Sequence, residues 1–311
     1  MRKMRGAIIV PTFYKGRHAK GLKSMVSKTL FDRIEKICNF PFVYTNTPDL
    51  RELDVALIYA VPYHNRPKIP SGLLDSNTKL ISYFGDLQCY QNRECEENKI
   101  KMFDRCSIII GGFYEKFKEW YPQYIHKYEL FSGFYHPYEN YKSLQINLKP
   151  KMKCLLSGTV NRYYPFREYI NKLYQEDTEG ISKLIDIKKR SFAPFREYPK
   201  FLNSYFCAIA TSGMYSGVVS KYFEIPAAGT LLLAEEVMEL KMLGMEPDIH
   251  YVSITRKNVL DKIQYVLSNS DRFLEMRIRA MNFVRKNHSD INRAFQFKSI
   301  LERLIGNNLD V

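Results

Sequence analysis

The chain has 311 residues, which is more than one hydrophobic core usually supports, so we expect two domains of ordinary size. Hydrophobic residues make up 45% of the sequence and charged residues 26%, a globular composition that excludes a disordered or fibrous protein. The formal net charge of +14 favours polyanionic ligands, among which nucleotide diphosphates, anionic lipid surfaces and nucleic acids all qualify, although solubility alone also explains such a charge.

The N-terminus is basic, and the apolar run that follows it ends at Pro11. This run is too short for a signal-peptide core or a membrane span, and no other stretch approaches a span. We therefore expect a cytoplasmic protein, either free or attached to the surface of an anionic membrane. The six cysteines form no C-x-x-C pair, so we expect reduced thiols in the core rather than disulfides or a zinc site.

The first half of the sequence predicts alternating strands and helices. Residues 6–11 (GAIIVP) are typical of a buried strand, and apolar residues between 22 and 37 recur at helical spacing. Further apolar runs at 54–61, 80–84 and 107–110 are separated by segments that can hold helices. This alternation predicts a parallel, Rossmann-like α/β sheet.

A change in composition at residues 133–148, which are rich in Pro, Gly, Asn and aromatic residues, marks the expected domain boundary. A second α/β series follows, with strands expected at 153–157, 205–210, 230–234 and 251–254 and helices at 257–267 and 271–287. We therefore expect Rossmann-like domains over 1–148 and 149–290, facing one another across a ligand-binding cleft. Residues 291–311 contain a helical pattern that could pack back on the first domain.

The most informative motif lies at residues 210–234 (ATSGMYSGVVSKYFEIPAAGTLLLA), where a loop of small residues leads into a short helix and a buried strand. Lys221, Glu224, Ala227 and Gly229 match the pattern K/R-x-x-E-x-x-A-x-G followed by an apolar strand. This stretch resembles the C-terminal donor domain of GT-B glycosyltransferases, specifically the group-1-like families. The resemblance implies an α/β fold of the GT-B class, in which the second of two Rossmann-like domains binds a nucleotide sugar.

The resemblance also implies roles for the polar residues of this motif. Glu224 would accept hydrogen bonds from the ribose hydroxyls of the nucleotide, and Lys221 would neutralise its diphosphate. The loop that contains Gly213, Ser216 and Gly217 would bring backbone N–H groups to the phosphate or the sugar. Many retaining relatives have a second glutamate where this sequence has Ser216. Taken alone, Glu224 could equally be a half-exposed helix residue.

A second motif, SGTVNRYYPFRE, starts at the end of a strand and leads into a helix near Pro165. It resembles the strand–glycine–loop–arginine pattern of the same families. We expect Gly158 and Thr159 to line the donor site, and Arg162 and Arg167 to hold the diphosphate, because a guanidinium can donate two parallel hydrogen bonds to phosphate oxygens. Their charge can replace a metal ion, and the sequence has no Asp-x-Asp motif to hold one. Two solvated arginines are the alternative interpretation.

Two residues of the first half are candidate bases. Asp86 closely follows the strand expected at 80–84, and an inverting transferase needs a base to take the acceptor hydroxyl proton as that oxygen attacks the anomeric carbon. The layout more distantly resembles that of phage DNA β-glucosyltransferases, in which an apolar strand also ends in a loop aspartate. An aspartate that only caps the turn is the alternative. His18, in the basic loop after the first strand, is the reserve base.

Together these features predict a metal-independent glycosyltransferase that uses a UDP-sugar or GDP-sugar, needs no separate cofactor, and acts with inversion on a glycan, lipid-linked or small-molecule hydroxyl. DNA with hydroxymethylated bases is a second candidate acceptor, because the positive charge and the 23 tyrosines and 20 phenylalanines suit a nucleic-acid partner. A non-catalytic protein that binds a nucleotide or another polyanion is the third interpretation, since a fold alone does not establish activity.

Overall fold

The computed structural model describes residues 5–10, 25–44, 51–58, 77–85, 93–188 and 196–306. Contacts within the chain divide it into two compact units, one of residues 1–133 with 290–311 and the other of residues 134–289. The second unit thus begins at the start of the stretch 133–148 in which the composition predicts the boundary, rather than at residue 149. The physical reason is that Tyr141 is buried in the core of the second unit, while Phe134 and Leu144 pack against that core.

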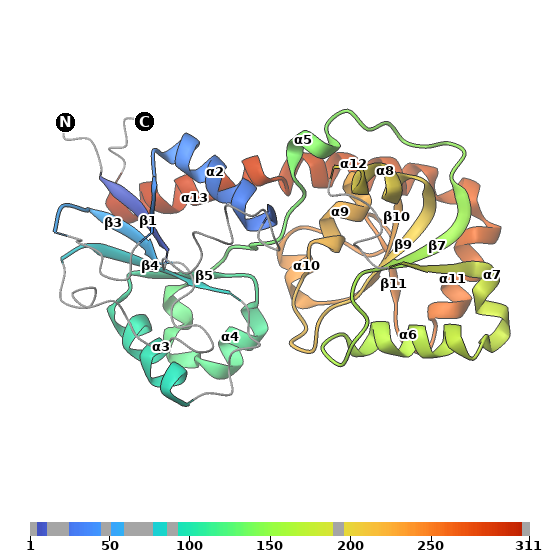
Figure 1. The fold of residues 1–311 in the computed structure, drawn as a ribbon, viewed down its shortest axis with the longest axis horizontal. Helices are drawn as coiled ribbons and strands as arrows, with labels where there is room; N and C mark the ends of the chain where they lie inside the picture. Colours follow the sequence, from blue (N-terminus) through green and yellow to red (C-terminus); the bar gives the residue numbers. More distant parts are fainter. Residues whose placement is uncertain are drawn as a thin grey trace. The chain divides into compact units, whose positions relative to one another are not determined.

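In the first unit, the described residues form a six-stranded parallel sheet in the order β2-β1-β3-β4-β5-β6 (Figure 1). Its strands are β1 (Gly6–Val10), β2 (Phe42–Tyr44), β3 (Val55–Ile58), β4 (Lys79–Phe84), β5 (Ile108–Gly111) and β6 (Tyr128–Leu130). Its helices are α2 (Met25–Cys38), α3 (Arg93–Arg105), α4 (Tyr114–Trp120), the 3-10 helix η2 (Pro122–Lys127) and α13 (Asp290–Ile305). The predicted strands are present, and the two that the sequence analysis missed, β2 and β6, are three-residue strands at the sheet edges.

The C-terminal helix α13 packs against α2 in the first unit (Figure 1). The thiol of Cys38 donates a hydrogen bond to the carbonyl oxygen of Ala294, with 3.8 Å between sulfur and oxygen. The rings of Phe40 and Phe297 meet edge to face, with 5.6 Å between their centroids. The end of the chain therefore completes the core of the unit in which the chain begins.

In the second unit, the described residues form a five-stranded parallel sheet in the order β11-β10-β9-β7-β8. The strands are β7 (Lys151–Ser157), β8 (Ile185–Lys188), β9 (Tyr205–Ala210), β10 (Leu231–Glu235) and β11 (Val252–Ile254). The helices are α5 (Tyr138–Tyr141), α6 (Pro165–Gln175), η3 (Thr178–Gly180), α7 (Ile181–Leu184), α8 (Tyr198–Asn203), α9 (Lys221–Ala227), α10 (Met238–Met242), α11 (Val259–Ser268), η5 (Ser270–Phe273) and α12 (Leu274–Asn287).

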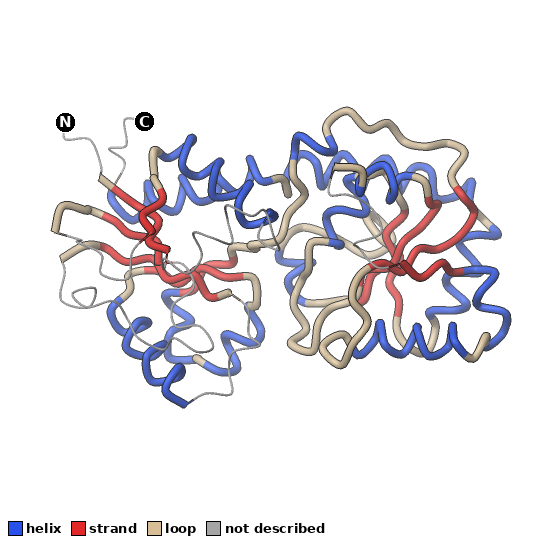
Figure 2. Tube along the Cα trace, viewed as in Figure 1, coloured by secondary structure: helices blue, strands red, loops and turns tan. Residues whose placement is uncertain are grey.

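Helices cover both faces of this second sheet (Figure 2). Along β9, Ala208 and Ala210 face the cluster that α8, α9 and α12 complete. Cys207 and Ile209 face the opposite cluster, which contains apolar residues of α6, α7 and α11. This alternation is the period of two that a strand imposes on a sheet buried on both sides. Cys38, Cys106, Cys154 and Cys207 are free and buried.

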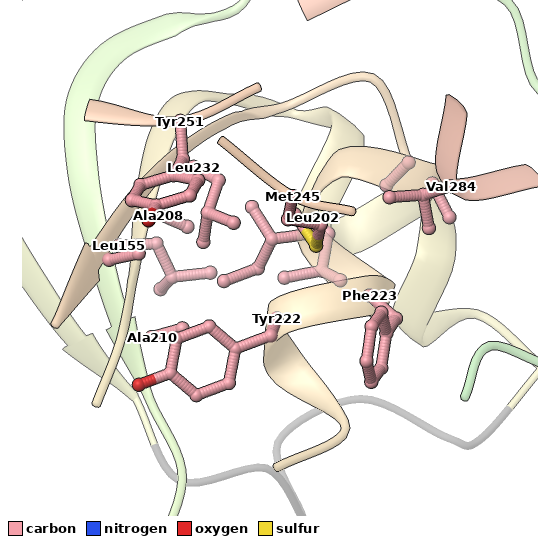
Figure 3. Close-up of a cluster of buried hydrophobic side chains, with 14 of the residues drawn as sticks. Leu155, Leu202, Ala208, Ala210, Tyr222, Phe223, Leu232, Met245, Tyr251 and Val284 are labelled. Atoms are coloured by element: carbon pink, nitrogen blue, oxygen red, sulfur yellow. The ribbon is translucent and has the colours of Figure 1, made fainter. Parts of the chain in front are cut away.

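Helix α9 is short, and all seven of its residues are buried. Tyr222 and Phe223 project from it into the hydrophobic cluster, where Leu202, Leu232 and Met245 also lie (Figure 3). Gly229, which has a φ of 76°, follows the end of the helix in the left-handed conformation that glycine adopts most readily. The helix that carries Lys221 and Glu224 is therefore fixed by its apolar neighbours.

Candidate functional site

Two loops of the second unit follow neighbouring strands at the point where the strand order reverses. The chain passes from β7 outward to the edge strand β8, and β9 then pairs with the other side of β7. Open α/β sheets bind their ligands at such a switch point, outside the carboxyl ends of the strands. The loops touch each other, because the backbone N–H of Met214 donates to the carbonyl oxygen of Tyr163 at 2.8 Å. Both motifs singled out in the sequence therefore flank the switch point of this sheet.

Arg167 lies in the first turn of α6, and only 3% of its surface is exposed. Its Nη1 donates a hydrogen bond to the carbonyl oxygen of Thr159 at 2.7 Å. Within the described part of the chain, its Nε has no hydrogen-bond partner, and no ion pair with a carboxylate involves Arg167. Burial lowers the pKa of this guanidinium, and the electrostatic influence of Tyr164, Tyr198, Tyr222 and Glu235 opposes that change. A buried cation without a counter-ion is unfavourable, so the site favours an anionic ligand.

Lys221, the first residue of α9, is also buried, with 6% of its surface exposed. Its Nζ donates hydrogen bonds to Ser157 Oγ at 3.0 Å and to the phenolic oxygen of Tyr198 at 2.7 Å. The two hydroxyl oxygens are 2.8 Å apart, so a further hydrogen bond closes a ring of three polar groups. The ring places the ammonium group at the carboxyl end of β7.

Gly158 brings Arg167 and Lys221 together. It follows β7 with a φ of 117°, a conformation that favours glycine. A Cβ atom at this position would lie 2.9 Å from Nη1 of Arg167 and 3.1 Å from Cε of Lys221. The missing side chain thus leaves room for two cationic side chains beside one backbone position, a concentration of positive charge that suits a diphosphate.

Glu224 lies three residues after Lys221, a spacing that puts both side chains on the same side of α9. Only 1% of its surface is exposed, so it is not the half-exposed helix residue that the sequence also allowed. A buried carboxylate is costly to place in a core, which makes a structural role alone a poor explanation.

The other predicted residues differ in burial. Arg162 is exposed, and its guanidinium carbon lies 5.2 Å from the centroid of the Tyr163 ring. Ser216 is exposed and has a φ of 54°, while Gly217 is buried in the same loop. Asp86 and His18 lie outside the described residues. The structure therefore brings together Gly158, Arg167 and Lys221, and it leaves Arg162 at the surface.

Three further polar residues lie at this site and were not predicted from the sequence: Ser157, Tyr198 and Glu235. Oε2 of Glu235, at the end of β10, accepts hydrogen bonds from the backbone N–H of Ser212 at 2.8 Å and from its hydroxyl at 2.9 Å. This carboxylate thereby anchors the start of the loop after β9. A polar residue at the end of an apolar strand was the available signal for Ser157 and Glu235, whereas nothing in the local sequence marks Tyr198.

Within the described part of the chain, no group of three or more His, Cys, Asp or Glu side chains is placed to hold a metal ion. None of the helices described there is long and apolar enough to cross a membrane.

Several solved structures match nearly the whole chain. A glycosyltransferase from Rickettsia africae has a TM-score of 0.64 at 10% sequence identity, covering 99% of this chain and 100% of its own. Anabaena HepE (Alr3699), solved with UDP, has a TM-score of 0.60 at 8% identity and covers 96% of this chain and 100% of its own. An alpha-glucosyltransferase solved with UDP-glucose and DNA containing an abasic site has a TM-score of 0.58 at 13% identity, covering 97% of this chain and 99% of its own. These likenesses confirm the predicted α/β fold of the GT-B class.

No curated protein sequence matches the chain. A family model described as glycosyl transferase-like matches residues 144–299, which is half of the chain and includes the switch point with both of its loops. The chain therefore belongs to the glycosyl transferase-like family.

Proposed function

We propose that the protein transfers a sugar from a nucleotide-diphosphate donor, and that the donor binds at the carboxyl ends of β7 and β9. One observation carries the proposal: Arg167 is a buried cation that has no counter-ion among the residues that the structure describes, and it lies beside Lys221 at the switch point of the sheet. A diphosphate supplies the missing negative charge together with acceptors for the guanidinium and ammonium donors.

The nucleotide would be oriented by residues around this charge. Glu224 would accept hydrogen bonds from the ribose hydroxyls, and the backbone of the loop that Glu235 anchors would approach the phosphate or the sugar. A UDP-sugar is the first donor to test, since two solved structures of the same fold contain UDP or UDP-glucose, and a GDP-sugar is the second. Arg167 and Lys221 would balance the diphosphate charge without a metal ion.

The transfer step forms a bond from the acceptor oxygen to the anomeric carbon and breaks the bond from that carbon to the diphosphate. The nucleoside diphosphate leaves with the bonding electron pair, stabilised by Arg167 and Lys221. The proton of the acceptor hydroxyl passes to a base, for which we propose Asp86, with His18 as the reserve. Attack from the face opposite the leaving group inverts the anomeric configuration.

Thermal unfolding in the presence of nucleotides and nucleotide sugars, with and without magnesium, tests the donor site. A ligand that binds only the native state raises the unfolding temperature, so one nucleotide family should stabilise the protein selectively and without magnesium. No shift with any UDP or GDP derivative would contradict the proposal. Once a donor is identified, Asp86→Asn should abolish transfer while donor affinity stays unchanged.

For the acceptor, we propose a glycan, lipid-linked or small-molecule hydroxyl, with DNA as the second class. The net charge of +14 and the structural match to an alpha-glucosyltransferase solved with DNA favour testing DNA. DNA binding that weakens steeply as salt rises, together with transfer to hydroxymethylated bases, would identify a DNA-modifying enzyme. Donor binding without hydrolysis or transfer to any acceptor would instead identify a non-catalytic nucleotide-binding protein.

A further inference from the structure

The hydrogen-bonded ring of Lys221, Ser157 and Tyr198 joins three separate elements of the second unit. Ser157 is the last residue of β7, Tyr198 the first of α8, and Lys221 the first of α9. The exposed fractions of Ser157 and Tyr198 are each only 2%, so the ring is shielded from solvent. A polar ring in this position is not needed to fill the core, since apolar residues of similar size would do so without the cost of burying an ammonium group.

The geometry of the ring fixes the position of the Lys221 ammonium group. A lysine has a flexible four-carbon stem, so a single contact would leave its charge poorly placed. Here the ammonium donates to two oxygen atoms at 3.0 and 2.7 Å, and those oxygens are themselves linked at 2.8 Å. The stem passes close to Gly158, and the Arg167 guanidinium lies near the same glycine. The ring therefore holds one cation close to another, against their mutual repulsion.

We infer that Tyr198 and Ser157 are positioning residues that hold the Lys221 ammonium beside Arg167, so that both cations meet the diphosphate of the donor. The inference rests on the proposed function, because it assumes that an anion binds between these cations. A positioning role differs from a purely structural role in one respect. Loss of the Tyr198 hydroxyl should weaken binding of the phosphates, through Lys221, and should leave the affinity for the nucleoside unchanged.

The test is a double-mutant cycle measured by calorimetric titration. Wild type, Tyr198→Phe, Lys221→Met and the double variant are titrated with UDP, GDP and inorganic pyrophosphate, and also with uridine and guanosine. The matched control is Tyr205→Phe. Tyr205 is the first residue of β9, at the end of that strand opposite the candidate site, and its phenolic hydroxyl donates a hydrogen bond to Asp186. The unfolding of each ligand-free variant is measured in parallel. A second double-mutant cycle uses Ser157→Ala in place of Tyr198→Phe, because this substitution also disrupts the ring.

We expect Tyr198→Phe to weaken binding of the diphosphates about ten- to a hundredfold, the range for a hydrogen bond to a charged group, with nucleoside affinity unchanged. In the Lys221→Met background the same substitution should have no further effect. Tyr205→Phe should reduce stability without changing any affinity.

Three results would overturn the inference alone while the proposed donor site stands: unchanged diphosphate affinity in Tyr198→Phe, an equal loss with and without Lys221, or an equal loss for nucleoside and diphosphate. Failure of the wild type to bind UDP, GDP and pyrophosphate would overturn both the proposed function and the inference.

Discussion

The guanidinium carbon of Arg167 lies 4.1 Å from the centroid of the Tyr164 ring, three residues earlier in the chain. Tyr164 immediately precedes α6, so the stacking fixes the plane of the guanidinium at the start of the helix. An aromatic face attracts a cation, but it does not neutralise its charge. The arginine is therefore held in place while its charge remains available to a ligand. Replacing it should have opposite effects on ligand affinity and on the stability of the ligand-free protein.

Arg167→Met should lower nucleotide-diphosphate affinity about a hundredfold, since a buried, hydrogen-bonded charge pair contributes ~2–5 kcal/mol to binding. The same substitution should raise the free energy of unfolding of the ligand-free protein by about 1 kcal/mol, because it removes a buried charge that forms no ion pair with the described carboxylates. Titration calorimetry and denaturant unfolding measure the two effects. Arg272→Met, at an exposed position in η5, is the control and should change both quantities little. Equal losses of affinity in the two variants would contradict the assignment of Arg167.

Glu224→Gln should reduce the ability of the protein to distinguish UDP from 2′-deoxy-UDP. If the buried carboxylate accepts hydrogen bonds from the ribose, the wild type should prefer the ribonucleotide by about tenfold, and the weaker amide acceptor should reduce that preference. Competition of each nucleotide against a fluorescent UDP analogue gives the ratio. A preference that is the same in both proteins would remove Glu224 from the ribose site.

Much of the fold follows from local patterns in the sequence. The runs GAIIV, KLISYF, YFCAIA and LLLAE form strands near the expected residues, because a strand buried on both faces is apolar throughout. Strand β8 was missed because it reads IDIK, an edge strand in which Asp186 forms ion pairs with Lys151 and Lys153 instead of an apolar side chain packing in the core. Whether such a segment forms a strand depends on the residues that it contacts in the folded protein, and the local sequence does not reveal these contacts.

The candidate site was only partly predictable for the same reason. Arg167 and Lys221 could be named because each lies in a motif next to an apolar strand. Their proximity depends on the packing of α6 and α9 around Gly158, and the sequence contains no direct signal for it. Tyr198 enters the site only because α8 returns to the carboxyl end of β7, more than forty residues away in the chain. Polar contacts between distant elements are a product of the tertiary structure.

Gly158→Ala should be more damaging than Gly180→Ala, although both glycines have a positive φ. At Gly180, with a φ of 68°, an added Cβ meets nothing within 4 Å, so only the backbone strain of about 1 kcal/mol applies. At Gly158 the Cβ would also push against Arg167 and Lys221, and we expect a loss of about 2–4 kcal/mol of stability together with weaker nucleotide binding. Chemical denaturation and UDP titration of the two variants test this. Similar losses at both positions would show that the cations do not crowd Gly158.

Stability should fall in acid partly through Asp186. Burial raises the pKa of this carboxyl, but hydrogen bonds from Lys151, Lys153 and Tyr205 outweigh that effect and lower the pKa to about 2. An unfolded aspartate has a pKa of about 3.9, so the stabilisation is fully present above that pH and is lost as the pH falls towards 2.

Asp186→Asn should therefore cost on the order of 1–2 kcal/mol at pH 7, and the difference from wild type should shrink as the pH falls from about 4 to 2. Lys153→Met removes one of the partners, with its Nζ 3.0 Å from the carboxylate, and should show a smaller loss with the same pH dependence. Urea unfolding at a series of pH values measures both. A difference that persists undiminished at pH 2 would mean that the carboxylate charge contributes nothing, and that the amide merely packs less well against Lys151, Lys153 and Tyr205.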